Sequence, residues 1–315
     1  MSNFAMPVRR LLLAELRLLH YSGVWILSLP LVLSAAAAYA GSRSSVRTRA
    51  DDFERLAGQY RAEGVSMDDV LAAPTSVTVH EDGSETIENP LKHDFLELSD
   101  LIAATDPVHM PATALDLTTF LVFPLAFLFV GAWMANVDRG TRAVDWRASR
   151  HAWASVACAK FIAVAVVAVV AIITTALAGM VIGSVAELLF GPVNEELPIP
   201  AASETPRPFL VKCAVSILFA ALWGLLGYLI GYVTRSFSWS ILLAALFLFV
   251  VPFMGKWDPR NAQAVLGHHV YDFWGQFKVR TAIPMSGLEM AISFGLMGVL
   301  IVVGLVRAAR RPRYT

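Results

Sequence analysis

The sequence predicts an all-α polytopic membrane protein with six transmembrane helices, and three observations support this fold class. Hydrophobic residues make up 57% of the chain and charged residues only 16%, and the mean hydropathy is +0.60, which lies outside the range of soluble globular chains. Six apolar runs approach the roughly 20 residues that a helix needs to cross a hydrocarbon core of about 30 Å. The charged residues are segregated along the chain. The runs lie at about 21–40, 117–137, 161–183, 209–233, 237–254 and 287–308.

Residues 1–20 precede the first span, and within them 7–20 predict an amphipathic interfacial helix, an elbow before the membrane. At about 100° per residue, the leucines form one apolar arc, and Arg9, Arg10 and Arg17 lie opposite. Such a helix rests in the headgroup layer. Glu15 falls inside the apolar arc, where an unpaired charge is costly. We therefore expect either a cation or a helix N-terminus beside Glu15, or a side chain that bends back to water.

The connection 41–115 is long enough to form a small α/β cap outside the membrane. It holds 6 basic and 14 acidic residues, a net charge of −8. A helix is expected over 51–64, where a glycine ends it, and another over 91–104. Residues 76–80 and 85–88 flank a glycine-containing turn and predict a hairpin. The cap either packs as a lid on the outer mouth or helps to receive or release a substrate, in which case its acidity favours cationic cargo.

The orientation follows from the positions of the basic residues, which concentrate in cytoplasmic connections. Arginines occur before the first span, in the loop 138–160, at Arg235 and in the tail 309–315, whereas the acidic connection 41–115 suits the outside. An even number of spans then places both termini in the cytoplasm and the protein in the inner or plasma membrane. The first run is expected to be a span and not a cleaved signal peptide, because its apolar stretch exceeds a typical signal core.

The connection 255–286 contains a second amphipathic segment that is expected to form a short helix dipping into the outer leaflet. Leu266, Val270 and Phe273 share its apolar face with Trp274 and Phe277. Two adjacent histidines, 268 and 269, point about 100° apart on a helix, so we expect no metal site there. The two cysteines, 158 and 213, lie near opposite faces of the membrane, which disfavours a disulfide.

The spans are notable for lacking charge at their centres. Asp116, Lys212 and Glu289 all lie near span ends, so ion-coupled transport lacks the intramembrane carrier residue that such proteins retain. Hydroxyl side chains line either a path for amphiphilic cargo or helix–helix contacts. Three glycines of the fourth span allow close helix packing. The hydroxyl residues are Thr118, Thr119, Thr174, Thr175 and Ser216, and the glycines are Gly224, Gly227 and Gly231.

The order of these elements resembles the permease subunit of type-2 ABC exporters, and the inner loop 138–160 carries the closest likeness. In this loop Asp138 lies two residues before the pair Gly140-Thr141. The pair Ser149-Arg150 follows about eight residues later, and Lys160 lies where the next span is predicted to begin. The layout covers nearly the whole chain, but the motif spans about 23 residues. The chain has aspartate where the family commonly has glutamate and no proline just before Ser-Arg, and its first outer loop is long, so the subfamily and the cargo stay open. The motif residues are Asp138, Gly140, Thr141, Ser149, Arg150 and Lys160.

This resemblance implies that a coupling helix within 138–160 docks into a cleft of a separate cytoplasmic ATPase. The loop has residues suited to that role: a glycine for a sharp exit from the second span, a threonine N-cap, two tryptophans as anchors, and arginines that can pair with acids on a partner. Alternatively, the arginines only enforce topology beside anionic lipid. The residues assigned to ATPase coupling are Asp138, Arg139, Gly140, Thr141, Arg142, Trp146, Arg147, Ser149, Arg150, Trp153 and Lys160.

The resemblance also implies that the chain is not itself an enzyme. It lacks the phosphate loop G-x-x-x-x-G-K-[ST], so ATP and Mg are expected in the partner ATPase, with two ATPase subunits and a second permease copy or paralogue. The expected cargo is hydrophobic or amphiphilic: a drug, an antimicrobial peptide or a lipid. Membrane lipid is the other expected partner, and nucleic acid is not. A membrane sensor or scaffold that binds an ATPase is the alternative. An intramembrane enzyme is disfavoured, because none of the seven histidines lies in a span core.

Overall fold

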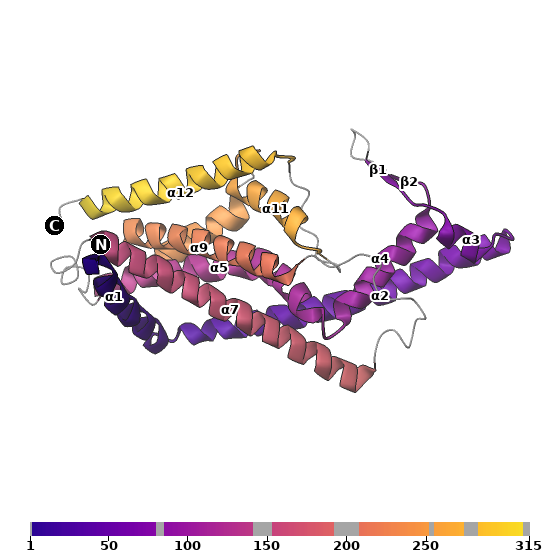
Figure 1. Cartoon of the computed structure of the whole chain (residues 1–315), viewed down its shortest axis with the longest axis horizontal. Coiled ribbons are helices and arrows are strands. Elements are labelled where there is room, and N and C mark those ends of the chain that lie inside the picture. Colours follow the sequence, from indigo (N-terminus) through magenta and orange to yellow (C-terminus); the bar gives the residue numbers. More distant parts are fainter. Residues whose placement is uncertain are drawn as a thin grey trace.

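Long helices lie side by side in this protein, and a polar extension projects from one end of the bundle (Figure 1). The computed structural model describes residues 2–79, 85–140, 153–191, 208–251, 255–273 and 283–310. The bundle consists of α1 (Ser2–Tyr21), the 3-10 turn η1 (Val24–Leu27), α2 (Ser28–Ala62), α5 (Met110–Gly140), α7 (Trp153–Phe190), α9 (Phe209–Thr234), α10 (Phe237–Ala245), the π-helical η2 (Leu246–Val250), α11 (Pro259–Val270) and α12 (Gly287–Arg310).

Four of the described helices are long and apolar enough to cross a membrane, which makes this a membrane-embedded helical protein. They are η1 with α2 (Val24–Ala62), α5 over Met110–Val137, α7 over Cys158–Phe190, and α9. Two shorter apolar helices cover the fifth and sixth predicted runs, at Phe237–Val250 and Gly287–Val303. The start of α1 and the end of α12 lie at the same end of the bundle, opposite the extension (Figure 1).

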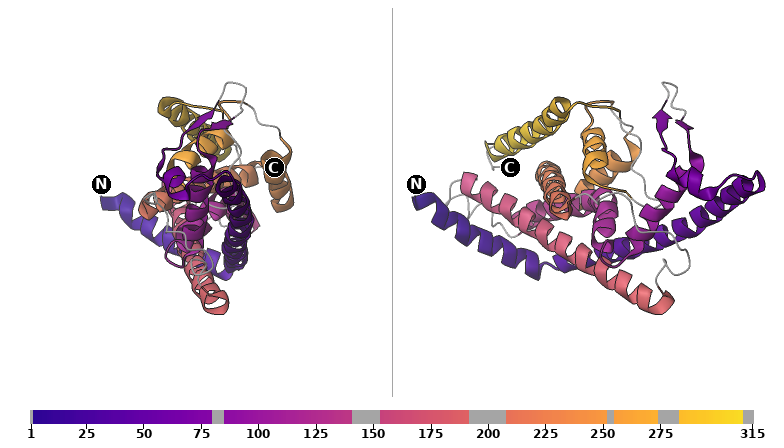
Figure 2. Two further views of the ribbon diagram at one scale, coloured as in Figure 1. Left: turned by 90° about the vertical axis from the view of Figure 1, so that its right-hand side faces the viewer. Right: turned by 45° about the vertical axis from the view of Figure 1, so that its right-hand side comes forward.

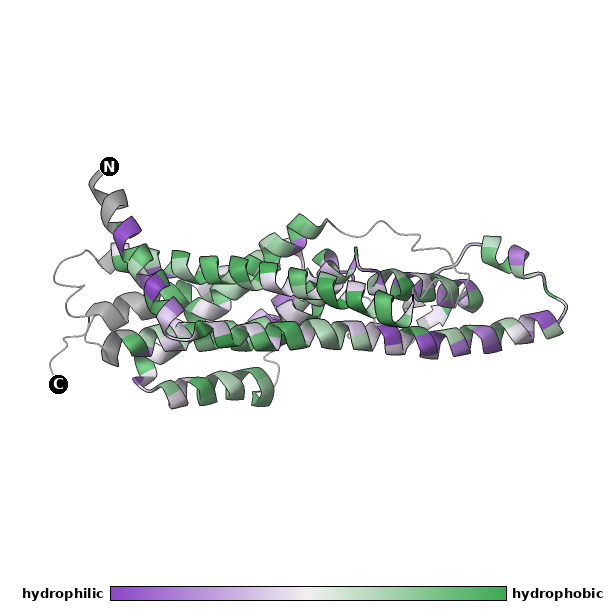
Figure 3. Cartoon of the chain, turned by 90° about the horizontal axis from the view of Figure 1, so that it is seen from below, coloured by the Kyte–Doolittle hydropathy of each residue, from purple (hydrophilic) through white to green (hydrophobic). Residues whose placement is uncertain are grey.

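The first span and the first cap helix are one continuous helix, which corrects the prediction of a span at 21–40 and a separate helix at 51–64. Gly23, in the left-handed conformation with φ of 79°, separates α1 from η1, and α2 then runs for 35 residues. No proline interrupts 41–50, so nothing in that stretch breaks the helix. Figure 3 shows α2 changing from hydrophobic residues in its first half to hydrophilic ones at its far end. As predicted, the helix ends just before Gly64, whose φ is 76°.

The extension consists of the far part of α2, the short helix α3 (Met67–Ala72), the strands β1 (Val77–Val79) and β2 (Glu85–Ile87), and α4 (Pro90–Thr105). The predicted hairpin is confirmed, since β1 and β2 pair antiparallel with Val77 opposite Ile87. The predicted helix at 91–104 is also confirmed. It packs on α2 through an apolar cluster that includes Val46, Leu98 and Ile102.

The closest helix packing joins α5 and α9, which run in parallel. A Cβ at Gly227 would lie 2.7 Å from the Leu128 Cα, and one at Gly231 would lie 3.0 Å from the Ala132 Cα. The first distance is shorter than real Cβ atoms show, so only glycine permits the contact at position 227, and a Cβ at position 231 would be tightly crowded. The predicted role of the fourth-span glycines is therefore confirmed. A parallel pair in such backbone contact is expected to move as one unit.

The fifth apolar run forms only a short helix, whose end is capped by an arginine. After α10 and η2 the helix stops at Val250, and Arg260 Nη1 donates hydrogen bonds to the carbonyl oxygens of Phe247 (2.9 Å) and Val251 (3.0 Å). Asp258 then caps the start of α11 by accepting from the Arg260 backbone N–H. Within the described residues, the predicted dipping helix ends earlier than expected. It stops at Val270, and Phe273 has a positive φ of 50°.

Candidate functional site

Three ionisable side chains meet inside the bundle near the end that carries the extension. The Lys212 Nζ lies 2.9 Å and 3.1 Å from the two carboxylate oxygens of Asp116 and 2.8 Å from Oδ2 of Asp272. Asp116 and Lys212 are 4% and 1% exposed, and the Asp272 side chain is 10% exposed. We call these three residues the charge cluster. With two acids and one base, it depends on the lysine for its stability.

The segment Tyr271–Phe273 is tied to the same cluster by hydrogen bonds. The backbone N–H groups of Asp272 and Phe273 donate to Oδ2 of Asp116 at 3.3 Å and 3.2 Å. The phenol of Tyr271 donates to the Lys212 carbonyl oxygen at 3.1 Å and lies 2.8 Å from the Ser216 hydroxyl. Burial raises the pKa of the Tyr271 phenol well above its usual range, so it stays protonated and able to donate. The positive φ of Phe273 is thereby held by bonds to a buried carboxylate.

Three elements contribute one member each to the charge cluster: α5, α9 and the segment that follows α11. Asp116 and Lys212 lie within the first two turns of their helices. Because both helices start at the extension end, the two charges reach the same depth. Both residues were predicted near span ends but not as a pair. Opposite charges at matching depth on spans that run the same way are the sequence signal for this pair. The cluster fastens the loop after α11 to the α5–α9 pair.

A second buried ion pair lies at the opposite end of the bundle. Glu15 Oε1 lies 3.2 Å from Lys160 Nζ, and the two side chains are 1% and 6% exposed. The ammonium also lies over the ring of Tyr228, 5.3 Å from its centroid. We call Glu15 and Lys160 the elbow pair. The expectation that Glu15 has a cationic partner is confirmed, and the alternative of a side chain bent back to water is wrong, because the pair is buried.

The elbow pair joins α1 to the beginning of α7, and these helices lie together in both Figure 1 and Figure 2. Leu11 of α1 packs there against Val156 and Ala159 of α7. Arg9, Arg10 and Arg17, predicted to face water and phosphate, are exposed. α1 thus presents basic residues outward and buries its single acid.

Most of the predicted ATPase-coupling loop lies outside the described residues. This applies to Thr141, Arg142, Trp146, Arg147, Ser149 and Arg150. Asp138, Arg139 and Gly140 are the last three residues of α5, and Trp153 is the first of α7. Lys160 is the one coupling residue whose side chain is described. It lies within α7, because the helix begins eight residues before the predicted third span.

The predicted intramembrane hydroxyls form helix–helix or local hydrogen bonds. The Thr119 and Ser216 hydroxyls lie 2.8 Å apart and bridge α5 to α9, and those of Ser34 and Thr118 lie 2.7 Å apart and bridge α2 to α5. Thr174 and Thr175 donate to carbonyl oxygens of their own helix. The helix-packing interpretation therefore accounts for Thr118, Thr119 and Ser216, whereas the bonds of Thr174 and Thr175 stay within α7.

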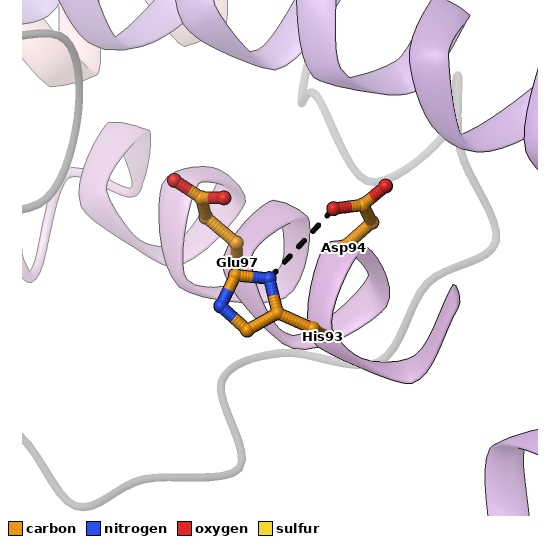
Figure 4. Close-up of side chains that lie close together, drawn as sticks. All are labelled: His93, Asp94 and Glu97. Carbon is orange, nitrogen blue, oxygen red and sulfur yellow. Dashed lines mark ion pairs between the residues drawn. The ribbon is translucent and has the colours of Figure 1, made fainter. Parts of the chain in front are cut away.

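Three residues of α4 could together contact a cation. His93, Asp94 and Glu97 have ligand atoms within 4.8 Å of one another, and Figure 4 shows the His93 ring directed at the Asp94 carboxylate, 3.7 Å away. Glu97, however, already accepts a hydrogen bond from Arg49 of α2 at 3.1 Å. All three side chains are partly exposed. The group is better explained as part of the α2–α4 contact.

We find no match to this chain among known protein families, curated proteins or solved structures.

Proposed function

We propose that this chain is the permease subunit of an ATP-driven exporter of the type-2 ABC class, and that a separate ATPase drives it through the loop 138–160. The observation that carries the proposal is the elbow pair. Lys160 lies about two turns inside α7, the helix that follows the loop, and its ammonium is held by Glu15 of α1. A displacement of the loop by the ATPase would therefore move α1 and α7 together.

The length and packing of α7 suit it to transmit such a displacement. The helix has 38 residues, about 57 Å at 1.5 Å per residue, and it runs from the elbow pair to the extension end. Near its far end it packs on the start of α5, where a Cβ at Gly179 would lie 2.8 Å from the carbonyl oxygen of Met110. Displacement at one end of α7 is thus carried to the start of α5, close to the charge cluster.

In this proposal the chain crosses the inner or plasma membrane six times, with α10–η2 and α12 as the fifth and sixth crossings and both termini in the cytoplasm. Two features support the topology: α1 and the end of α12 lie at one end of the bundle (Figure 1), and that end is the basic one. The acidic extension then lies outside. ATP and Mg bind in the partner ATPase, and a second permease copy or paralogue completes the complex.

The cargo class follows from the chemistry of the spans. Apolar and aromatic side chains dominate them, and the described intramembrane hydroxyls already have hydrogen-bond partners. A hydrophobic or amphiphilic molecule therefore suits the permease better than a polar one.

Affinity purification of the tagged chain from its native membrane tests the proposal. We expect an ATPase to copurify, and its ATP hydrolysis to rise when an amphiphilic cargo is added. Arg150→Glu should reduce the retained ATPase at least about fivefold, because a charge reversal opposes pairing with acids on the partner. Arg235→Glu, the same change at an exposed residue outside the loop, should not.

The copurification also separates the rival functions. A scaffold would retain the ATPase but show no stimulation of hydrolysis by any cargo. Purification without any ATPase, or equal retention in the two arginine variants, would contradict the assignment of the loop.

A further inference from the structure

A cavity of about 260 Å³ lies between α1, η1 and the start of α2 on one side and α5 and α7 on the other. Its lining is almost wholly apolar and includes Leu19, Leu31, Phe127 and Val170. It shares no residue with the charge cluster or the elbow pair. It is too large to be a packing defect and is close to the size of small-ligand pockets.

The polar groups in the cavity lining already have partners. Trp25 Nε1 donates to His20 Nδ1 at 2.9 Å, and the Ser28 hydroxyl donates to the Trp25 carbonyl oxygen at 2.6 Å. The Thr174 hydroxyl donates to its own helix. Because the rest of the lining is apolar, the cavity favours a hydrocarbon chain over a polar ligand.

The cavity lies in the half of the bundle that carries α1. Its α7 lining begins at Val166, six residues beyond Lys160, and continues to Thr174. At 1.5 Å per residue these positions lie about 9 to 21 Å from the elbow pair. One leaflet of a hydrocarbon core about 30 Å thick is about 15 Å deep, so most of this range lies at the depth of the acyl chains on the side of α1.

The surface beside the cavity is apolar near Trp25 and basic along α1. These two parts match the acyl chains and the anionic headgroup of a phospholipid. Trp25 is 51% exposed, and Ile26 and Leu29 are 70% and 59% exposed, which suits contact with acyl chains. On α1 the exposed charges are Arg9, Arg10 and Arg17, because the helix's single acid is buried in the elbow pair. Such a surface attracts anionic headgroups.

We propose that this cavity binds one acyl chain of an anionic phospholipid from the leaflet in which α1 lies, and that arginines of α1 hold its phosphate. The bound chain fills the space between the elbow and the α5–α7 contact. It thereby fixes α1 against α7. The proposal does not depend on the chain being an exporter.

Native mass spectrometry of the purified chain, titrated with phosphatidylglycerol or with phosphatidylcholine of the same acyl chains, tests the proposal. We expect one tightly retained phosphatidylglycerol, preferred over phosphatidylcholine at least about tenfold on the strength of the arginines. Val170→Trp places an indole in the cavity and should lower retention of both lipids about tenfold or more. Val169→Trp is the matched control: Val169 is 41% exposed against 38% for Val170, and it does not line the cavity.

A separate variant tests whether the arginines of α1 bind the lipid headgroup. Replacing Arg9, Arg10 and Arg17 together with glutamine should abolish the preference for phosphatidylglycerol while leaving a cavity that still accepts a chain. Should Val170→Trp fail to fold, this arginine variant decides alone. Equal loss in the two tryptophan variants would overturn the site. An unchanged lipid preference in the arginine variant, or none in the native chain, would overturn the assignment to anionic lipid.

Discussion

Replacing Lys212 with methionine perturbs the charge cluster while keeping the length of the buried side chain. The substitution removes an ammonium whose nitrogen lies 2.9 Å from Asp116 and 2.8 Å from Asp272. Two carboxylates then face each other in a site from which water is largely excluded. Asp116 keeps its two backbone N–H donors, but these do not replace a full charge.

Removal of one partner from a buried ion pair costs about 3–5 kcal/mol. We therefore expect Lys212→Met to lower the free energy of unfolding by about that amount and the melting temperature on the order of 10 °C. Thermal unfolding of the purified chain in mild detergent, followed by intrinsic fluorescence, measures the change. Adding Asp116→Asn should recover about half of the loss, because the amide oxygen still accepts from the backbone and one buried charge is gone.

Lys256→Met is the control for this experiment. Lys256 pairs with Glu289 at 2.7 Å, but the two side chains are 39% and 28% exposed, and such pairs contribute about 1 kcal/mol or less. If Lys212→Met lowered the melting temperature no more than Lys256→Met, the charge cluster would not stabilise the fold, and our interpretation of it would fail.

Two further predictions concern the contacts on which the proposed transmission depends. Gly227→Ala should lower the free energy of unfolding by about 1–3 kcal/mol, since its Cβ would meet the backbone of Leu128. Gly295→Ala, where a Cβ meets nothing within 4 Å, should leave the free energy of unfolding unchanged. Equal melting temperatures in the two variants would count against close α5–α9 packing. Glu15→Gln should cost about 3 kcal/mol and expose α1 to limited proteolysis, because it leaves the buried lysine of the elbow pair without its counter-charge. Asp52→Asn, in an exposed pair, should change neither stability nor cleavage, and an equally protected α1 in both variants would refute the elbow pair.

The parts of the fold that the sequence predicted are those set by local pattern. Helical periodicity predicted α4 and the apolar arc of α1, and alternating residues predicted the hairpin. An acid inside an apolar arc indicated that Glu15 has a partner, but not that the partner is Lys160. Small residues at four-residue spacing gave the contact at Gly227 and Gly231. The sequence signal for each of these lies in residues that are close together in the chain.

The parts of the fold and of the site that the sequence did not predict depend on contacts between segments far apart in the chain. The charge cluster joins residues 96 positions apart in one pair and draws its second acid from the loop after α11. The arginine that caps η2 lies 13 residues beyond the carbonyl oxygen it contacts, and periodicity says nothing about it. The continuity of α2 was not predicted, because the polar residues from 41 onward indicate where the apolar run ends but do not end the helix. The early end of α11 follows from Asp116, which holds the next segment in a non-helical conformation.

A chemical crosslink from the inner loop tests the central claim most directly. In a chain with Cys158→Ala and Cys213→Ala, the one cysteine introduced by Ser149→Cys should crosslink to a lysine of a copurified ATPase through a short reagent that joins a thiol to an amine, and it should react with an impermeant maleimide only in inside-out vesicles. The predicted result is this adduct, and no adduct when the ATPase is stripped from the membrane before the reagent is added. Labelling of the introduced cysteine on intact cells, or a complex that hydrolyses ATP but never yields the adduct, would contradict the account.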